Sequence, residues 1–103
     1  MITIKIGSSQ REFSIGDIDE RWIAQQVARQ KKDGPVCVRI IIRAGVGIDM
    51  ELATAGCPKS IGSRAATTSE RSIFELWHEQ GLDDDNFSGG TVVSFLKKLR
   101  RFL

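Results

Sequence analysis

Apolar and polar residues alternate along two stretches of this chain, and the clearer stretch covers residues 36–52. A period of two is typical of a strand with one buried face. The pattern therefore predicts an amphipathic β-hairpin over residues 36–52. Its apolar face consists of Val36, Val38, Ile40, Ile42, Val46, Ile48, Met50 and Leu52.

The turn of this hairpin must contain an odd number of residues. A two-residue turn would pair apolar with polar positions, so that opposite faces of the two strands would meet. We expect a three-residue loop at 43–45, with its glycine in the left-handed conformation. This register places Ile42 opposite Val46 and Arg39 opposite Asp49.

A second alternating stretch lies at the N-terminus and predicts another hairpin. Three alternate isoleucines precede residues 7–10, and Phe13 and Ile15 follow them. We expect residues 7–10 to form a four-residue loop, which places Ile4 opposite Phe13 and Ile2 opposite Ile15. The apolar side chains of this hairpin then share one face.

Three further segments begin with residues that commonly cap helices. The first begins at Asp17, three residues before Glu20, and ends at the Asp-Gly-Pro sequence of residues 33–35. Two more begin after Thr67 and Ser88 and form a C-terminal helical pair over about residues 69–102. The buried sides are expected to consist of Ile23, Ala24 and Val27 in the first helix, Ile73, Phe74 and Trp77 in the second, and Val92, Val93, Phe95, Leu96, Leu99 and Phe102 in the third.

Residues 53–68, between the second hairpin and the helical pair, are small and polar without a sustained period. Loops of this length are uncommon in domains and are usually either functional or mobile, and the sequence favours neither. The element order β-β-α-β-β-α-α predicts a single α+β domain over residues 1–103. We expect a four-stranded, mostly antiparallel sheet with the helices packed on one face.

The composition is that of an ordinary globular protein, with 41% hydrophobic and 27% charged residues. The formal net charge of +2 is far from the strong basic excess of a dedicated nucleic-acid binder. No apolar run approaches the roughly 20 residues that span a bilayer. The N-terminus lacks the features of a secretory signal. We therefore expect a cytoplasmic protein without a membrane partner.

Cys37 and Cys57 are the only cysteines, which is too few for a disulfide framework. With His78 as the single histidine they do not complete a tetrahedral zinc site, so we expect no metal and no cofactor. Cys57 precedes a proline and has Lys59 and Arg64 nearby, and cationic neighbours favour the reactive thiolate. Cys57 is therefore the candidate reactive thiol. Because the sequence indicates no base to activate it, we assign no catalytic residue, and a thiol-dependent enzyme is only the second alternative.

An acidic run, residues 83–90, has the composition of a calcium-binding loop. An EF-hand loop requires glycine at its sixth position and glutamate at its twelfth. Counting from Asp83 places Ser88 and Ser94 at these positions, and counting from Asp85 places Leu96 at the twelfth. The run is better interpreted as a polar turn before a helix, where negative charge is favoured.

The candidate contact residues for a partner or a nucleic acid lie at the C-terminus: Lys97, Lys98, Arg100, Arg101 and Phe102. The outward positions of the hairpins are mixed in charge and carry no aromatic ring to stack on bases, which disfavours nucleic acid. The leading hypothesis is a small non-enzymatic protein-interaction module, with a homodimer through the final helix as one form of it. A nucleic-acid-binding accessory protein that uses the basic helix is the first alternative.

Overall fold

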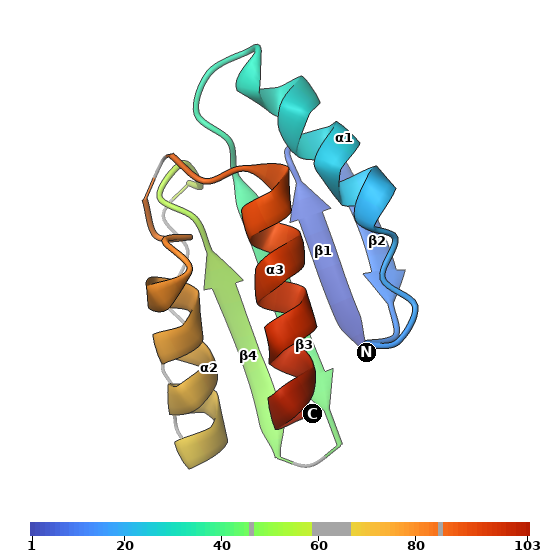
Figure 1. Cartoon of the computed structure of the whole chain (residues 1–103), viewed down its shortest axis with the longest axis vertical. Helices are drawn as coiled ribbons and strands as arrows, with labels where there is room; N and C mark the ends of the chain where they lie inside the picture. The colour runs from blue at the N-terminus through green and yellow to red at the C-terminus, as the bar shows by residue number, and fades with distance from the viewer. Residues whose placement is uncertain (46, 59–66, 85) are drawn as a thin grey trace.

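The computed structural model describes residues 1–45, 47–58, 67–84 and 86–103. Four strands form one antiparallel sheet in the order β2-β1-β3-β4, and the helices lie on one face of it (Figure 1). This arrangement confirms the predicted α+β class and element order. The elements are β1 (Ile2–Ile6), β2 (Ser9–Phe13), α1 (Glu20–Lys31), β3 (Val38–Ala44), β4 (Ile48–Ala53), α2 (Thr68–Glu79), α3 (Gly89–Leu99) and the short 3-10 helix η1 (Arg100–Phe102).

The hydrophobic core lies between the sheet and the helices. Every predicted inward aliphatic residue of the second hairpin that the structure describes is buried, as are Ile2, Ile4 and Ile6 of β1. The C-terminal helix α3 lies over the middle of the sheet and runs along its strands (Figure 1). Its Phe95 meets Trp77 of α2 edge to face, with ring centroids 5.2 Å apart. Each such buried side chain contributes roughly 1.5–3 kcal/mol before conformational entropy is subtracted.

The first hairpin has a shorter loop than the sequence predicted. The predicted register is wrong, because Ile2 lies opposite Phe13 and Ile4 lies opposite Arg11. Only Gly7 and residue 8 separate the strands, and the positive φ of 59° at Gly7 is the conformation that a type II′ turn requires at its first central position. The shift by two residues preserves the parity of the faces, so the side chain of Phe13 still enters the core.

The second hairpin has the predicted parity and loop length at a different position. Ala44 pairs with Ile48 and Ile42 with Met50, so the three-residue loop lies at 45–47 instead of 43–45. Gly47, with φ of 86°, takes the left-handed third position. The predicted pairing of Ile42 with Val46 is therefore wrong, and Val46 itself lies outside the described residues.

The N-cap of helix α1 lies two residues after the predicted capping residue, and the helix begins at Glu20. Its N-cap is Asp19, whose carboxylate accepts a hydrogen bond from the Trp22 amide at 3.0 Å. Asp17, the predicted cap, instead accepts a hydrogen bond from the Ser14 hydroxyl at 3.1 Å. Ala24 is exposed, contrary to the prediction, and Gln26 takes the third buried position.

The two C-terminal helices begin as predicted. Thr67 and Glu70 form a complete capping box at α2, and Ser88 caps α3. Phe74 was expected in the core but is 39% exposed, and Leu76 is buried in its place. Phe102, at the end of the chain, is only partly buried.

Helix α2 flanks β4, the strand at one edge of the sheet (Figure 1). Glu70 joins the two elements, because its carboxylate accepts hydrogen bonds from the Asp49 amide of β4 at 3.4 Å and from the Thr67 amide at 2.9 Å. An unpaired strand edge is a site of unwanted association between chains. Helix α2 therefore protects this edge. Within the described residues, no helix is both long and apolar enough to cross a bilayer.

Candidate functional site

The predicted basic residues of the C-terminus lie on two sides of the molecule. Lys97 points toward α1, and its Nζ lies 3.0 Å from Glu20 Oε1. Arg100 lines the same small cavity as Lys97, which lies between α3 and the residues that lead into α1. Lys98 and Arg101 face α2 instead. The structure therefore brings the basic residues together in two pairs rather than in one patch.

The second pair forms one wall of a groove of about 260 Å³, which we call the α2–α3 groove. Glu75 and Glu79 of α2 form the opposite, acidic wall, and Leu76 and Phe102 supply its apolar surface. The four charged side chains are exposed, and no ion pair between the two walls is present in the described part of the chain. The complete lining is Ser72, Glu75, Leu76, Glu79, Lys98, Arg101 and Phe102.

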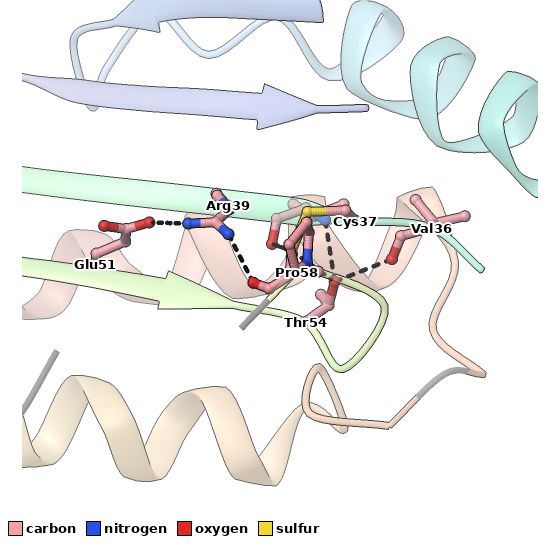
Figure 2. Close-up of a disulfide and its surroundings, with 8 residues drawn as sticks. Val36, Cys37, Arg39, Glu51, Thr54 and Pro58 are labelled. Atoms are coloured by element: carbon pink, nitrogen blue, oxygen red, sulfur yellow. Dashed lines mark hydrogen bonds and ion pairs between the residues drawn. A yellow bond between two sulfur atoms is a disulfide. The ribbon is translucent and has the colours of Figure 1, made fainter. Parts of the chain in front are cut away.

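Cys57, the predicted reactive thiol, is joined to Cys37 by a disulfide bond (Figure 2). Their Cα atoms are 4.4 Å apart, and no free cysteine remains among the described residues. In this oxidised form Cys57 therefore has no thiol to act as a nucleophile. Sequence reasoning missed the bond because its hairpin register placed Cys37 opposite Glu51. In the observed register, position 37 faces the residues that follow β4.

Thr54, the residue after β4, anchors the chain beside the disulfide (Figure 2). Its hydroxyl donates a hydrogen bond to the Val36 carbonyl and accepts one from the Val38 amide, each at 3.0 Å. Its own amide donates to the Val38 carbonyl at 3.0 Å. Because Thr54 is only 3% exposed, these hydrogen bonds form in a site that excludes water. They hold the chain after β4 in register with residues 36–38 at the start of β3.

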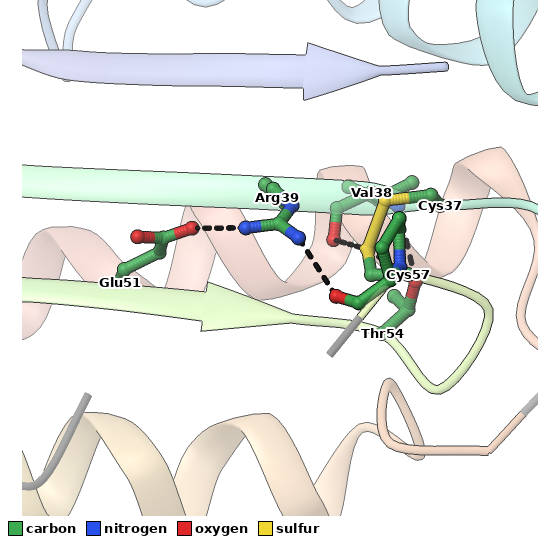
Figure 3. Close-up of polar contacts among 7 residues, drawn as sticks. Cys37, Val38, Arg39, Glu51, Thr54 and Cys57 are labelled. Atoms are coloured by element: carbon green, nitrogen blue, oxygen red, sulfur yellow. Dashed lines mark hydrogen bonds and ion pairs between the residues drawn. A yellow bond between two sulfur atoms is a disulfide. The ribbon is translucent and has the colours of Figure 1, made fainter. Parts of the chain in front are cut away.

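The turn that contains Cys57 is held by two further contacts. The Cys57 amide donates to the Thr54 carbonyl at 3.1 Å. Arg39 donates one hydrogen bond to the Pro58 carbonyl at 2.8 Å (Figure 2). It donates another to Glu51 at 2.9 Å (Figure 3). We call residues 36–39 and 54–58 the disulfide corner. Of the predicted loop 53–68, only residues 59–66 lie outside the described residues.

Gly56 allows the close approach of the two segments in the disulfide corner. A Cβ atom at this position would lie 2.6 Å from the carbonyl oxygen of Val36 and 3.0 Å from its carbonyl carbon. These neighbours are backbone atoms, which do not move aside as a flexible side chain would. The glycine is therefore needed for its lack of a side chain rather than for an unusual φ.

The outer face of the sheet, opposite the helices, carries no aromatic residue among its described positions. Arg39 pairs with Glu51 there, and Arg43 lies 3.8 Å from Asp49. The predicted pairing of Arg39 with Asp49 is wrong, because Arg39 lies opposite Ala53. The face is mixed in charge, and its arginines have acidic neighbours.

The remaining polar candidates lie at the surface. His78 is exposed and lies 2.7 Å from Asp83 through its Nδ1 atom. The acidic run was expected not to bind calcium, and Asp85 within it lies outside the described residues. In the described ranges, no group of three or more histidine, cysteine, aspartate or glutamate side chains is arranged to hold a metal ion.

Comparison with protein-family models, with curated proteins and with solved structures finds no significant match to this chain. No activity, substrate or partner of another protein is therefore available for transfer to it. Among the described residues, the α2–α3 groove combines two walls of opposite charge, and the disulfide corner holds the two cysteines.

Proposed function

We propose that this chain is a small non-enzymatic protein-interaction module that self-associates through the α2–α3 groove. One observation carries the proposal: Glu75 and Glu79 form an acidic wall opposite the basic wall of Lys98 and Arg101. The occupant of the groove is a second copy of the chain.

Self-association by a two-fold axis brings the same surface of both copies together. A surface of one charge sign would repel its copy. A surface with one acidic and one basic wall is complementary to itself when the two-fold axis runs along the groove, because that rotation places each acidic wall against the basic wall of the other copy. Leu76 and Phe102 would lie between these charged contacts. The groove therefore meets the electrostatic requirement for a symmetric dimer.

The expected dimer is weak and sensitive to salt. Stable interfaces bury about 800 Å² on each partner, which is more than a groove with seven lining residues provides alone. Exposed ion pairs contribute about 0.2–1 kcal/mol each and are screened by salt. We therefore expect a dissociation constant on the order of tens of micromolar at low ionic strength.

Sedimentation equilibrium tests this proposal. At about 100 μM protein we expect mostly dimer in about 50 mM salt and mostly monomer in about 0.5 M salt. Replacement of Lys98 and Arg101 by alanine should abolish the dimer. The matched control replaces Lys97 and Arg100 by alanine, which removes the same charge from the other side of α3. A monomer at low salt, or equal effects of the two double substitutions, would contradict the proposal.

The proposal includes a cytoplasmic location, with which the ordinary globular composition is compatible. Thiol reductants in that compartment keep most cysteines reduced. A cytoplasmic chain should therefore carry Cys37 and Cys57 at least partly as thiols. Alkylation of intact cells before lysis measures this fraction. A pair that is wholly oxidised in cells would argue for another compartment.

The nucleic-acid alternative relies on the same basic helix and receives less support. Glu20 neutralises Lys97, and the acidic wall lies across the groove from Lys98 and Arg101. The outer sheet face also offers no stacking ring among its described positions. We expect no retention on heparin at about 0.15 M salt. Retention that is lost when Lys97, Lys98, Arg100 and Arg101 are neutralised would favour nucleic-acid binding instead.

A further inference from the structure

We propose that Cys37 and Cys57 form a reversible thiol–disulfide exchange site. The site would react with low-molecular-weight thiols and disulfides while the protein remains folded. The two cysteines are the only ones in the 103-residue sequence, so within one chain each can form a disulfide only with the other. This proposal does not depend on self-association through the α2–α3 groove.

The disulfide is accessible to a small reactant. Both cysteines are half-buried, and they lie where β3 begins and shortly after β4 ends. Cys37 continues the alternation of β3 on the outer side of the sheet, whereas the helices cover the other side (Figure 1). Neither cysteine belongs to the hydrophobic core. Cleavage of the bond would therefore leave no cavity in that core.

The disulfide corner is held together by contacts that do not involve sulfur. Thr54 makes hydrogen bonds to both Val36 and Val38, and Arg39 holds the carbonyl group of Pro58. The β3–β4 ladder pairs residues up to Arg39 and Ala53, next to the corner. These contacts would keep the two thiols close after reduction. Re-formation of the bond is then an intramolecular step with a high effective concentration.

The reduced form also has hydrogen-bond partners in place. Cys57 Sγ lies 3.6 Å from the Val38 carbonyl oxygen and 3.7 Å from Thr54 Oγ1. In the disulfide the sulfur carries no proton and cannot donate. After reduction, the Cys57 thiol can donate to either oxygen without movement of the backbone. The same local structure therefore suits both redox states.

The chemistry consists of two exchange steps. A thiolate from the reductant attacks one cysteine sulfur, the Cys37–Cys57 bond breaks, and the other cysteine leaves as a thiolate that takes up a proton. A second reductant thiolate attacks the mixed disulfide, releases the oxidised reductant and frees the first cysteine. Two thiols thus supply two electrons, and the products are two cysteine thiols and one small disulfide. Oxidised glutathione drives the reverse sequence.

The test equilibrates the purified protein in buffers with different ratios of reduced to oxidised glutathione. Acid quenching, alkylation and mass spectrometry then count the free thiols, and circular dichroism monitors the fold. We expect one two-electron transition with the same midpoint from either direction and an unchanged spectrum. A Cys37→Ser/Cys57→Ser variant should be folded and unresponsive. Resistance to reduction without denaturant, unfolding on reduction, or failure of the folded dithiol to reoxidise would each overturn the proposal.

Thr54 is a positioning residue in this proposal, and two substitutions examine its role. Thr54→Val removes the hydroxyl that bridges Val36 and Val38, and it should slow reoxidation of the dithiol by about tenfold, the equivalent of one to two lost hydrogen bonds. Thr54→Ser keeps the hydroxyl and should restore the rate. Equal reoxidation rates in folded wild-type, valine and serine proteins would show that the corner does not preposition the thiols.

Discussion

Gly89, at the start of α3, permits a close approach between α3 and α1. A Cβ atom at this position would lie 2.8 Å from the Cα of Ala24 and 3.4 Å from its Cβ. The nearer atom belongs to the backbone of a helix, so relief of the clash requires movement of one helix relative to the other. Gly90, the next residue, has only Ser88 Oγ within reach, at 3.6 Å.

These two neighbouring glycines give a matched pair of substitutions. Gly89→Ala should lower the free energy of unfolding by about 1–3 kcal/mol, because the added methyl group overpacks the helix contact. Gly90→Ala should be neutral or stabilise by up to about 1 kcal/mol, because alanine favours helix. Urea denaturation of both variants measures the difference. Equal effects would show that α1 and α3 do not pack as closely as described.

Short-range residue signals located two of the three predicted helix caps and missed the third, because Asp19 rather than Asp17 caps α1. The predicted capping box at Thr67 and the predicted N-cap at Ser88 are the correct ones, because all their hydrogen bonds form within one helical turn. The exposure of Ala24 and Phe74 was predicted wrongly. Which face of a helix is buried depends on the elements that pack beside it. The helical period of the sequence allows more than one set of residues to form the buried apolar face.

At the scale of elements, the hairpins show what alternation can and cannot specify. The hydrophobic pattern fixes which face of a strand is buried, and both hairpins have the predicted parity. A shift by two residues preserves that parity, so the pattern does not choose between such registers. The turn glycines decide the choice: Gly7 begins one turn and Gly47 ends the other, each with positive φ.

Glu70 links two elements and should therefore matter more than an ordinary helix cap. Thr67→Ala should cost about 1 kcal/mol through loss of the cap. Glu70→Ala should cost more, about 2–3 kcal/mol, because this buried carboxylate also accepts a hydrogen bond from Asp49 of β4. Exposed Glu75 on the same helix is the control, and its alanine variant should change stability by less than about 0.5 kcal/mol.

Chemical denaturation of the three alanine variants measures these differences. A Glu70 variant no less stable than the Thr67 variant would show that the contact between α2 and the β4 edge contributes little to stability.

At the scale of the whole molecule, the disulfide should stabilise the fold without being required for it. The bond closes a loop with a sequence separation of 20 residues, for which chain entropy predicts about 3 kcal/mol. A domain of this size typically has about 5–15 kcal/mol of stability. The Cys37→Ser/Cys57→Ser variant should therefore be about 3 kcal/mol less stable than the oxidised protein and still folded. Urea titrations followed by circular dichroism measure this, and an unfolded variant would contradict it.

Both candidate sites combine residues that are distant in the sequence, which limits what the sequence could predict. The basic C-terminal residues and Cys57 were identified, but their partners were not. The acidic wall of the groove comes from α2, and its position beside Lys98 and Arg101 depends on how two helices pack. The partner of Cys57 depends on a hairpin register that alternation leaves open.

Mixing two charge-reversed variants tests self-association through the α2–α3 groove most directly. Glu75→Lys/Glu79→Lys makes both walls basic, and Lys98→Glu/Arg101→Glu makes both walls acidic. Each variant should be a folded monomer at about 100 μM and low salt, whereas an equimolar mixture should sediment as a one-to-one dimer. Dimers of either variant alone, or a mixture that remains monomeric while both variants are folded, would contradict the account.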